Sequence, residues 1–269
     1  MTDNAKFDGS IPLLYDRHMG PVIFEPYADD LAQRVASMTL EGPVLETACG
    51  TGRLTKHLRA KLPNSAKLYA TDLNQAMIDV ARDRHREEFD VEWKQADAMA
   101  LPFPDSMFSA VVNQFGMMFV QDKATAIGEA ARVLNGGGLF AFSVWDNIAE
   151  NPFGQTAERV ILSFFSSDLP TFFQVPFGFH DTEVWIKLLN ENGFTQISVQ
   201  KVAFEARSES AEHFAIGLVR GGPISVAIQE RNLPIDEIIS ALTQALILEG
   251  GDQPFRSRMQ AFVITARSL

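Results

Sequence analysis

One stretch of the sequence decides the fold: Val44-Leu45-Glu46-Thr47-Ala48-Cys49-Gly50-Thr51-Gly52. An apolar run stops there at a turn of small residues, and helical periodicity follows from Arg53, so the pattern predicts a strand, a tight loop and a helix. Gly50 and Gly52 lack side chains where the backbone must bend and let a ligand approach, and the helix directs free N–H groups at that ligand. Glu46 adds a negative charge, which favours a ligand with a cationic group over a pyrophosphate.

The spacing of the glycines argues against a dinucleotide site. That fingerprint requires Gly-x-Gly-x-x-Gly, and Thr55 stands where the third glycine would be. A nicotinamide-dependent dehydrogenase is therefore disfavoured. The turn alone does not identify the ligand, because tight turns without a ligand share this pattern.

A second strand, predicted over residues 67–72, ends in Asp72, twenty residues beyond Gly52. In nucleotide-binding α/β folds a carboxylate at this distance accepts hydrogen bonds from the ribose hydroxyls. A helix cap is the alternative role for Asp72, because a helix is predicted from Asn74 to about Glu88. The distance from the glycine turn favours the ribose role.

Two further motifs carry a family resemblance. Glu46, Ala48, Gly50 and Gly52 form the pattern Glu-x-Ala-x-Gly-x-Gly, and residues 131–143 read ARVLNGGGLFAFS. Together they resemble the Rossmann-like (class I) S-adenosylmethionine (SAM) dependent methyltransferases, in particular the group related to ubiquinone and menaquinone C-methylating enzymes. Ala48 stands where that family usually has a glycine, so we expect a slightly tighter pocket with function retained. The resemblance covers about residues 40–146 and, more loosely, the remainder.

The resemblance implies an α/β fold. We expect a doubly wound sheet of seven strands, mostly parallel with an antiparallel last strand, and a helical cap. A single domain of residues 1–269 is predicted. Its core would comprise about 40–146 and 181–269, with an N-terminal cover over 11–38 and cap insertions over about 147–180 and 208–255.

The resemblance also implies SAM as the cofactor and assigns residues to it. Tyr15 would close over SAM from the N-terminal cover, and Asp97 and the backbone N–H of Ala98 would read the adenine edge. Asn113 and Gln114 end the predicted fourth strand, where ligands gather in open parallel sheets. The full predicted cofactor set is Tyr15, Glu46, Ala48, Gly50, Gly52, Asp72, Leu73, Met77, Asp97, Ala98, Asn113 and Gln114, with Leu73 and Met77 flanking the base.

Composition limits the partners. The 269 residues include 23 Lys plus Arg and 34 Asp plus Glu, a net charge of −11, which disfavours nucleic acids and anionic membranes. A single cysteine, Cys49, excludes a disulfide framework and a Cys-rich zinc site, and no metal is expected. Residues 1–10 lack the features of a signal peptide, so we expect a cytoplasmic protein without a membrane span. The oligomeric state stays open.

The segments flanking the predicted core are less regular. Residues 11–38 predict two short helices broken by prolines, which are Pro12, Pro21 and Pro26. Between Phe153 and Phe179 lie seven phenylalanines, which either line an acceptor pocket or pack this segment on the sheet. His18 and His180 are the candidates for a general base, while His57 and His85 are expected on helices far from the carboxyl end of the sheet.

These observations predict SAM-dependent methyl transfer to a small, largely apolar or aromatic metabolite. A quinone or lipid-precursor C-methyltransferase is the alternative within the fold. A SAM-binding protein without methyl transfer is the alternative outside that activity. A general base is required only if the acceptor must lose a proton.

Overall fold

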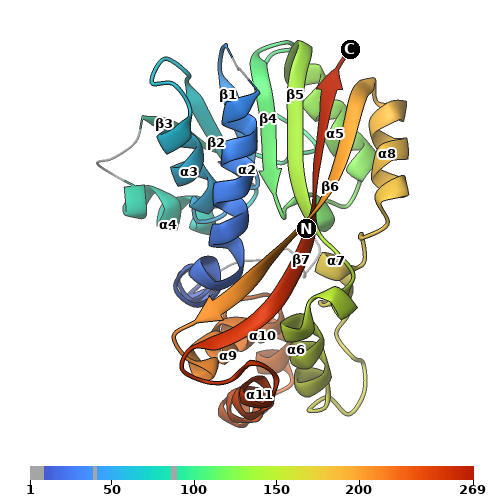
Figure 1. The fold of residues 1–269 in the computed structure, drawn as a ribbon. Helices are drawn as coiled ribbons and strands as arrows, with labels where there is room; N and C mark the ends of the chain where they lie inside the picture. Colours follow the sequence, from blue (N-terminus) through green and yellow to red (C-terminus); the bar gives the residue numbers. More distant parts are fainter. Residues whose placement is uncertain (1–8, 39–40, 86–89) are drawn as a thin grey trace. The chain divides into compact units, whose positions relative to one another are not determined.

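The computed structural model describes residues 9–38, 41–85 and 90–269 (Figure 1). The chain folds into two compact units. The sheet unit comprises residues 27–144, 180–201 and 262–269, and the helical unit comprises 9–26, 145–179 and 202–261. The single-domain organisation, with its N-terminal cover and cap insertions, stays a prediction. The start of the predicted core at about residue 40, and residues 1–8, lie outside the described ranges.

The strands form one seven-stranded sheet with the order β3-β2-β1-β4-β5-β7-β6. Neighbours from β3 to β5 run parallel, and β7 is antiparallel to both β5 and β6 (Figure 1). The predicted fold class is therefore confirmed, including the antiparallel last strand. The bounds are β1 Val44–Thr47, β2 Leu68–Asp72, β3 Val91–Gln95, β4 Phe108–Gln114, β5 Leu134–Trp145, β6 Phe194–Ser208 and β7 Phe255–Ser268.

The register aligns the carboxyl ends of the central strands. All four residues of β1 are buried, as a parallel strand between two neighbours must be. Thr47, at its end, lies opposite Thr71 of β2 and Asn113 of β4. The loops that leave these three strands therefore begin at the same edge of the sheet.

Helices occupy most of the remaining chain (Figure 1). In the sheet unit, Trp185 packs against Phe142 of β5 with ring centroids 5.2 Å apart, and Tyr27 packs edge-on against Phe115 at the same separation. The described helices are α1 Ile11–Leu14, a π-helix Tyr15–Phe24, α2 Glu25–Ser37, α3 Arg53–Lys61, α4 Gln75–His85, α5 Lys123–Val133, α6 Pro152–Leu162, α7 Gln174–Phe177, α8 Thr182–Glu191, α9 Ala211–Arg220, α10 Ile224–Glu230 and α11 Ile235–Gly250, with short 3₁₀ turns at Met117–Phe119 and Ile148–Glu150.

The N-terminal segment differs from the prediction of two helices broken by prolines. It is helical without interruption from α1 through the π-helix into α2. Pro12 lies in the first turn of α1, where a missing N–H costs little. Pro21 falls inside the π-helix, whose wide turn is closed by the Glu25 N–H donating to the Gly20 carbonyl. A local widening thus accommodates the proline that was expected to end the helix.

The helix predicted from Asn74 to about Glu88 is α4, which ends at His85. The last three residues of that prediction, 86–88, lie outside the described ranges. The helix begins one residue after Asn74, whose carbonyl accepts from the N–H of Met77 at 3.1 Å.

Aromatic rings form the core of the helical unit. Trp145 contacts three rings, those of Phe24, Phe153 and Phe177, at centroid distances of 6.3, 6.1 and 6.1 Å. Phe153 continues the chain of rings to Phe214 at 5.6 Å. Four of the seven phenylalanines between residues 153 and 179 are buried, namely Phe153, Phe165, Phe173 and Phe177. These four rings pack in the interior, as one of the two predicted roles requires. Phe164, Phe172 and Phe179 are half-buried.

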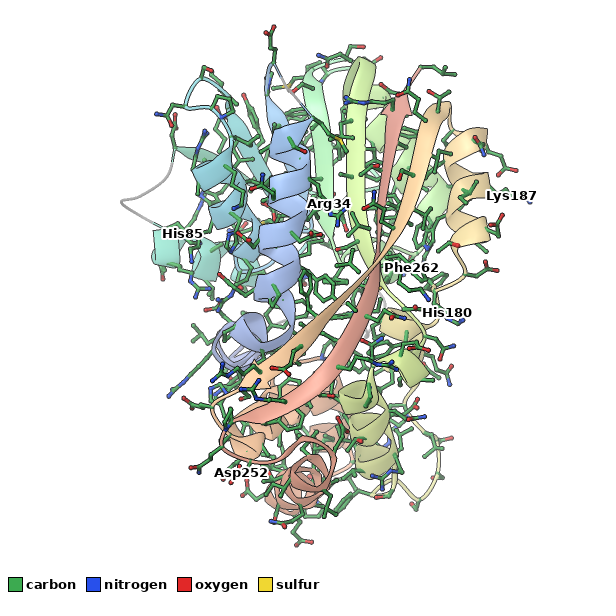
Figure 2. All side chains as sticks on the ribbon, in the orientation of Figure 1. Arg34, His85, His180, Lys187, Asp252 and Phe262 are labelled. Carbon is green, nitrogen blue, oxygen red and sulfur yellow. The ribbon has the colours of Figure 1, made fainter. Side chains whose placement is uncertain are left out.

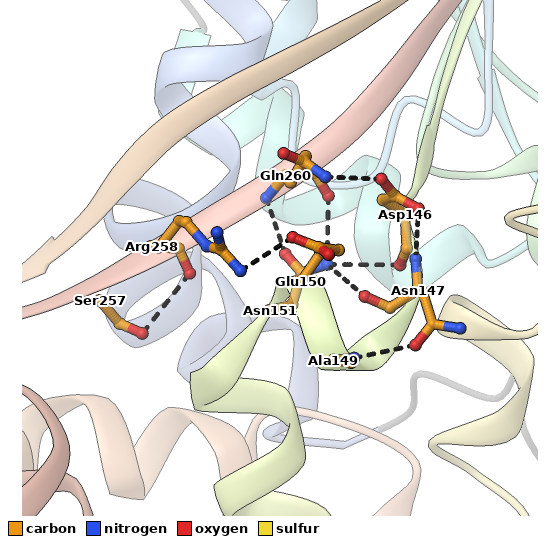
Figure 3. A network of polar contacts seen from close by, with 8 residues as sticks. All are labelled: Asp146, Asn147, Ala149, Glu150, Asn151, Ser257, Arg258 and Gln260. Carbon is orange, nitrogen blue, oxygen red and sulfur yellow. Dashed lines mark hydrogen bonds and ion pairs between the residues drawn. The ribbon is translucent and has the colours of Figure 1, made fainter.

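A buried polar clamp joins the segment after β5 to β7 within the helical unit (Figure 3). The Asn151 side chain is fully buried and accepts from the Gln260 N–H at 2.9 Å. Its Nδ2 donates to the carbonyls of Asp146, Asn147 and Gln260 at 3.1–3.3 Å. The Gln260 side chain in turn donates to the Asp146 carboxylate at 2.7 Å. One amide therefore contacts four backbone groups, of which the Asn147 and Gln260 carbonyls also accept from the N–H groups of Glu150 and Asp146.

Replacing that amide tests the clamp. Asn151→Ala removes the acceptor of the Gln260 N–H and the donor to the Asp146 carbonyl, and we expect a loss of about 2 kcal/mol in the free energy of unfolding. Asn147→Ala, which removes the acceptor for the Ala149 N–H, is the control and should cost about 1 kcal/mol or less. Urea titrations followed by circular dichroism measure both, and equal costs would contradict a special role for Asn151.

Candidate functional site

The glycine turn adopts left-handed backbone at three positions. The φ angles are +52° at Ala48, +55° at Gly50 and +79° at Gly52. A Cβ at Gly50 would meet no atom within 4 Å, so the backbone there borders open space that a ligand could approach. Gly52 is the N-cap of α3, and the N–H groups of the first turn follow it. The turn therefore has the geometry expected of an anion- or ligand-facing helix N-terminus.

His85 lies behind this turn, which corrects the prediction that it sits far from the carboxyl end of the sheet. A Cβ at Gly52 would lie 3.1 Å from the His85 ring. The ring is buried and stacks on Trp93, with planes 3° apart. Because helix α4 runs back past the turn, its last residue supports Gly52. His57 instead forms an ion pair with Asp29 at 3.1 Å.

Glu46 is buried in the centre of the sheet, with 1% of its surface exposed. The Thr55 hydroxyl of α3 donates to its carboxylate at 2.6 Å. Burial, and then the neighbouring negative charge of Asp72, raise the pKa of Glu46 to about 8, although the Thr55 hydrogen bond opposes the shift. The residue that breaks the dinucleotide fingerprint, Thr55, is thus the partner of the acid. Sequence reasoning missed this role, although the Glu-x₈-Thr spacing across the turn would have signalled it.

Asp72 ties the turn to the second strand. Its carboxylate accepts from the Gly50 N–H at 2.9 Å and from the Asn74 N–H at 2.8 Å. Burial raises its pKa, while these hydrogen bonds oppose the shift. The carboxylate stands at the start of α4 and also faces the glycine turn, and its ribose-binding role stays a prediction. Burial also raises the pKa of the Cys49 thiol, which therefore stays neutral and serves as a packed side chain.

The predicted adenine-binding residues lie next to Asp72. The Ala96 N–H donates to the Asp72 carbonyl at 3.0 Å, which fixes the start of the turn at residues 97–100. Asp97 accepts from the Met99 N–H at 2.8 Å, and its backbone pairs with Ala100. Met77 is buried, and Leu73, Asp97 and Ala98 are half-buried. The sheet unit therefore brings these predicted residues to one edge of the sheet.

Asn113 also lies at this edge, but its side chain is committed to the protein. Its Nδ2 donates to the Thr47 carbonyl and hydroxyl at 3.1 and 3.0 Å. Its Oδ1 accepts from the N–H groups of Gly116 and Met117, both at 2.9 Å. The amide therefore connects the end of β1 to the loop after β4. Gln114, the next residue, is half-buried at the end of β4.

The Ala48 methyl group packs against the same loop. A Cβ at Gly116 would lie only 2.4 Å from the Ala48 Cβ, and 2.9 Å from the Asn113 Nδ2. Gly116 therefore provides the space that alanine requires where the family usually has glycine.

The remaining predicted residues are distributed between the units. Tyr15 belongs to the helical unit, where its ring stacks on Phe24 at 5.0 Å. His18 is buried in the same unit, with its Nδ1 3.0 Å from the His213 carbonyl and its ring 4.2 Å from that of His213. Burial, followed by the charge of His213, lowers the pKa of His18. His180 belongs to the sheet unit, just before α8 (Figure 2).

Two classes of feature are absent from the described ranges 9–38, 41–85 and 90–269. Within them, no group of three or more His, Cys, Asp or Glu side chains could hold a metal ion. The helices of those ranges are also too short or too polar to cross a membrane.

Comparison with known sequences finds relatives for the segment of the chain that contains the glycine turn. A family profile described as a methyltransferase domain matches residues 44–138. Over 98 residues, 35% of this chain, the sequence is 42% identical to the ubiquinone/menaquinone biosynthesis C-methyltransferase UbiE of Hahella chejuensis and 39% identical to that of Saccharophagus degradans. The match spans 39% of the length of each of these relatives.

Solved structures extend the similarity to most of the chain. The YcgJ protein from Bacillus subtilis has a TM-score of 0.58 at 18% identity and covers 90% of this chain and 98% of its own. A phosphoethanolamine N-methyltransferase from Haemonchus contortus, in complex with S-adenosylhomocysteine, has a TM-score of 0.60 at 14% identity, covering 96% of this chain and 56% of its own. The [4+2]-cyclase SpnF has a TM-score of 0.58 at 20% identity, with 96% and 93% covered.

The sheet order and the glycine turn define a Rossmann-like, class I methyltransferase fold, to which the structural matches add support for the fold alone. Residues 44–138 match a methyltransferase domain, and over 98 residues the chain is similar to the ubiquinone/menaquinone biosynthesis C-methyltransferases. The resemblance indicated by the sequence motifs is confirmed.

The buried acid at position 46 predicts a pH dependence of stability. The pKa of Glu46 in the folded protein, about 8, lies above the ordinary value of 4.5. Its contribution to the free energy of unfolding is therefore fully present below pH 4.5 and is lost as the pH rises through 8. Glutamine does not titrate, so Glu46→Gln should not show this decrease. Between pH 5 and 8 the free energy of unfolding of the variant should rise relative to that of wild type by about 1 kcal/mol per pH unit.

Urea titrations of the ligand-free protein across this range provide the measurement. Glu41→Gln, an exposed change just before β1, is the control and should parallel wild type. A constant difference between Glu46→Gln and wild type over the range would show that Glu46 is ionised in the folded protein.

The contact between Ala48 and Gly116 predicts an interaction between two substitutions. Gly116→Ala should destabilise the protein by about 2 kcal/mol because the added methyl group overlaps that of Ala48. In an Ala48→Gly background the same change should cost about 1 kcal/mol less, since only the Asn113 contact remains. A double-mutant cycle of unfolding free energies measures this coupling, and additive effects would mean that the two positions do not touch.

Proposed function

We propose that this protein binds SAM at the glycine turn and transfers its methyl group to a small, largely apolar or aromatic metabolite. The observation that carries the proposal is the buried Glu46 beside a turn whose backbone borders open space at Gly50. A cationic ligand suits this acid, because its charge would favour the ionised carboxylate. The methyltransferase-domain match over residues 44–138 covers the same segment.

The other predicted residues keep the roles that the sequence suggested for them. Asp72 would accept from the ribose hydroxyls, and Asp97 with the Ala98 N–H would read the adenine edge. Leu73 and Met77 would flank the base. The half-buried Gln114 would face the ligand directly, whereas Asn113 would act through the loop that its amide holds. Tyr15 would close over the cofactor.

Bound SAM supplies an electrophilic methyl group on a positively charged sulfonium. The protein's part is to hold that group and the acceptor in line and to exclude water. Asp72, together with Glu46 when a bound cation favours its ionised form, would provide the negative charge that favours a cationic ligand. His18 and His180 are the candidates for removing a proton from the acceptor, and His18 would do so as a neutral ring, because its pKa is lowered. Acceptors that keep their protons need neither histidine.

The nature of the acceptor follows from the helical unit and from charge. The half-buried rings of Phe164, Phe172 and Phe179 are available for apolar recognition, whereas the four buried ones serve the core. The net charge of −11 disfavours nucleic acid. A cytoplasmic location agrees with these properties and is part of the proposal.

Two alternatives have specific support. Quinone or lipid-precursor C-methylation is favoured by the 42% identity to UbiE, although that identity extends over only 35% of this chain. Binding of SAM without methyl transfer is favoured by the similarity in fold to a [4+2]-cyclase. Incubation with SAM and a panel of aromatic, quinone and lipid acceptors, with detection of S-adenosylhomocysteine, separates the three functions. Labelling of nucleic acid alone would overturn the small-molecule proposal.

Asp72 provides the direct test of the cofactor site. Asp72→Asn keeps one acceptor oxygen for the glycine turn but loses the charge that would bind ribose, and we expect S-adenosylhomocysteine to bind about 1–3 kcal/mol more weakly. Asp79→Ala, an exposed change on α4, is the control and should bind as wild type does. Isothermal calorimetry measures both affinities. Unchanged binding by Asp72→Asn would remove Asp72 from the site, and tighter binding of NAD than of SAM would reject the proposal.

A further inference from the structure

Arg132, within the ARVLNGGG motif, uses all five of its N–H donors inside the sheet unit. Its Nε donates to Glu129 at 2.7 Å. One terminal nitrogen donates to the Phe103 carbonyl at 2.8 Å and to the Asp105 carboxylate at 2.7 Å. The other donates to the Leu101 carbonyl at 2.9 Å and to Glu129 at 2.8 Å. The guanidinium therefore fastens the loop 101–105 to helix α5 with a fork that lysine cannot reproduce.

Glu129, one turn earlier on α5, completes the attachment. Its Oε2 accepts from the Leu101 N–H at 2.7 Å, so Leu101 is held at its N–H by Glu129 and at its carbonyl by Arg132. The hydrogen bonds from Arg132 are the main cause that lowers the pKa of Glu129, which keeps it ionised as an acceptor. The Asp105 contact is different, because 76% of that side chain is exposed and such ion pairs contribute little.

Leu101 directly follows the turn at residues 97–100, which carries the predicted adenine-binding groups. At the other end of this turn, the Ala96 N–H donates to the Asp72 carbonyl at 3.0 Å. Between the two ends, Asp97 pairs with Ala100, the residue directly before Leu101. The positions of Asp97 and of the Ala98 N–H are therefore set by β2 on one side and by α5 on the other.

We propose that Arg132 and Glu129 are positioning residues that set the base specificity of the cofactor site by holding the 97–100 turn from its carboxyl end. This inference rests on the proposed function. In it, the Asp97 carboxylate accepts from the exocyclic amine of adenine, and α5 decides how accurately that acceptor is placed. A shift of the turn would weaken the discrimination between an amino group and a carbonyl on the purine.

The test compares the affinities of S-adenosylhomocysteine and S-inosylhomocysteine, whose base carries an oxygen in place of the amino group. Wild type should prefer the adenine compound. Arg132→Lys keeps the charge but loses the fork, and we expect the ratio of the two dissociation constants to fall by about tenfold. Arg256→Lys, which changes an exposed ion pair with Glu205, is the matched control and should keep the wild-type ratio.

A purely structural role for Arg132 would lower the melting temperature while leaving the ratio unchanged in the folded protein, and that result would overturn the inference. If Arg132→Lys does not fold, Glu129→Gln decides, since it keeps one acceptor oxygen and places an amide against Arg132 or Leu101. A ratio for Glu129→Gln equal to that of wild type also contradicts the inference. Failure of wild type to bind either compound would reject the proposed function instead, so the two failures are distinguishable.

Discussion

The hydrogen bond between Thr55 and Glu46 is the constraint on which the site depends. A carboxyl group buried in the centre of a parallel sheet is costly unless it is neutral or hydrogen-bonded. Here the hydroxyl that satisfies it comes from the first turns of α3. The helix must therefore pack close to the end of β1, and only a short turn with left-handed residues can join them. This geometry requires glycine at positions 50 and 52 whether or not a ligand binds there.

Side chains at the ends of β2 and β4, and one on helix α5, hold the loops at this edge of the sheet. Asp72 holds the glycine turn through Gly50, and Asn113 holds the loop after β4 through Gly116. Arg132 holds the loop after β3 from α5. Each of these contacts uses a charged or amide group on backbone N–H or C=O groups, so the edge of the sheet is shaped before any ligand arrives. Preorganisation of this kind reduces the ordering that a ligand must induce.

The family resemblance implied the antiparallel last strand. Local patterns predicted the strands and the placement of Asp72, because these depend on periodicity and on spacing along the chain. They failed where a distant partner decides the outcome. Pro21 does not end its helix, since a wide turn accommodates it. His85 lies behind Gly52 because α4 runs back along the turn. The roles of Thr55 and Arg132 depend on contacts between elements, which no single stretch of sequence displays.

Strands β6 and β7 each contribute residues to both units, with 202–208 and 255–261 assigned to the helical unit. The helices α9, α10 and α11 thus form one continuous block of chain between two strands that are neighbours in the sheet. In evolutionary terms such a block is an exchangeable insert. A lineage can lengthen, shorten or replace it without altering the strand order or the glycine turn.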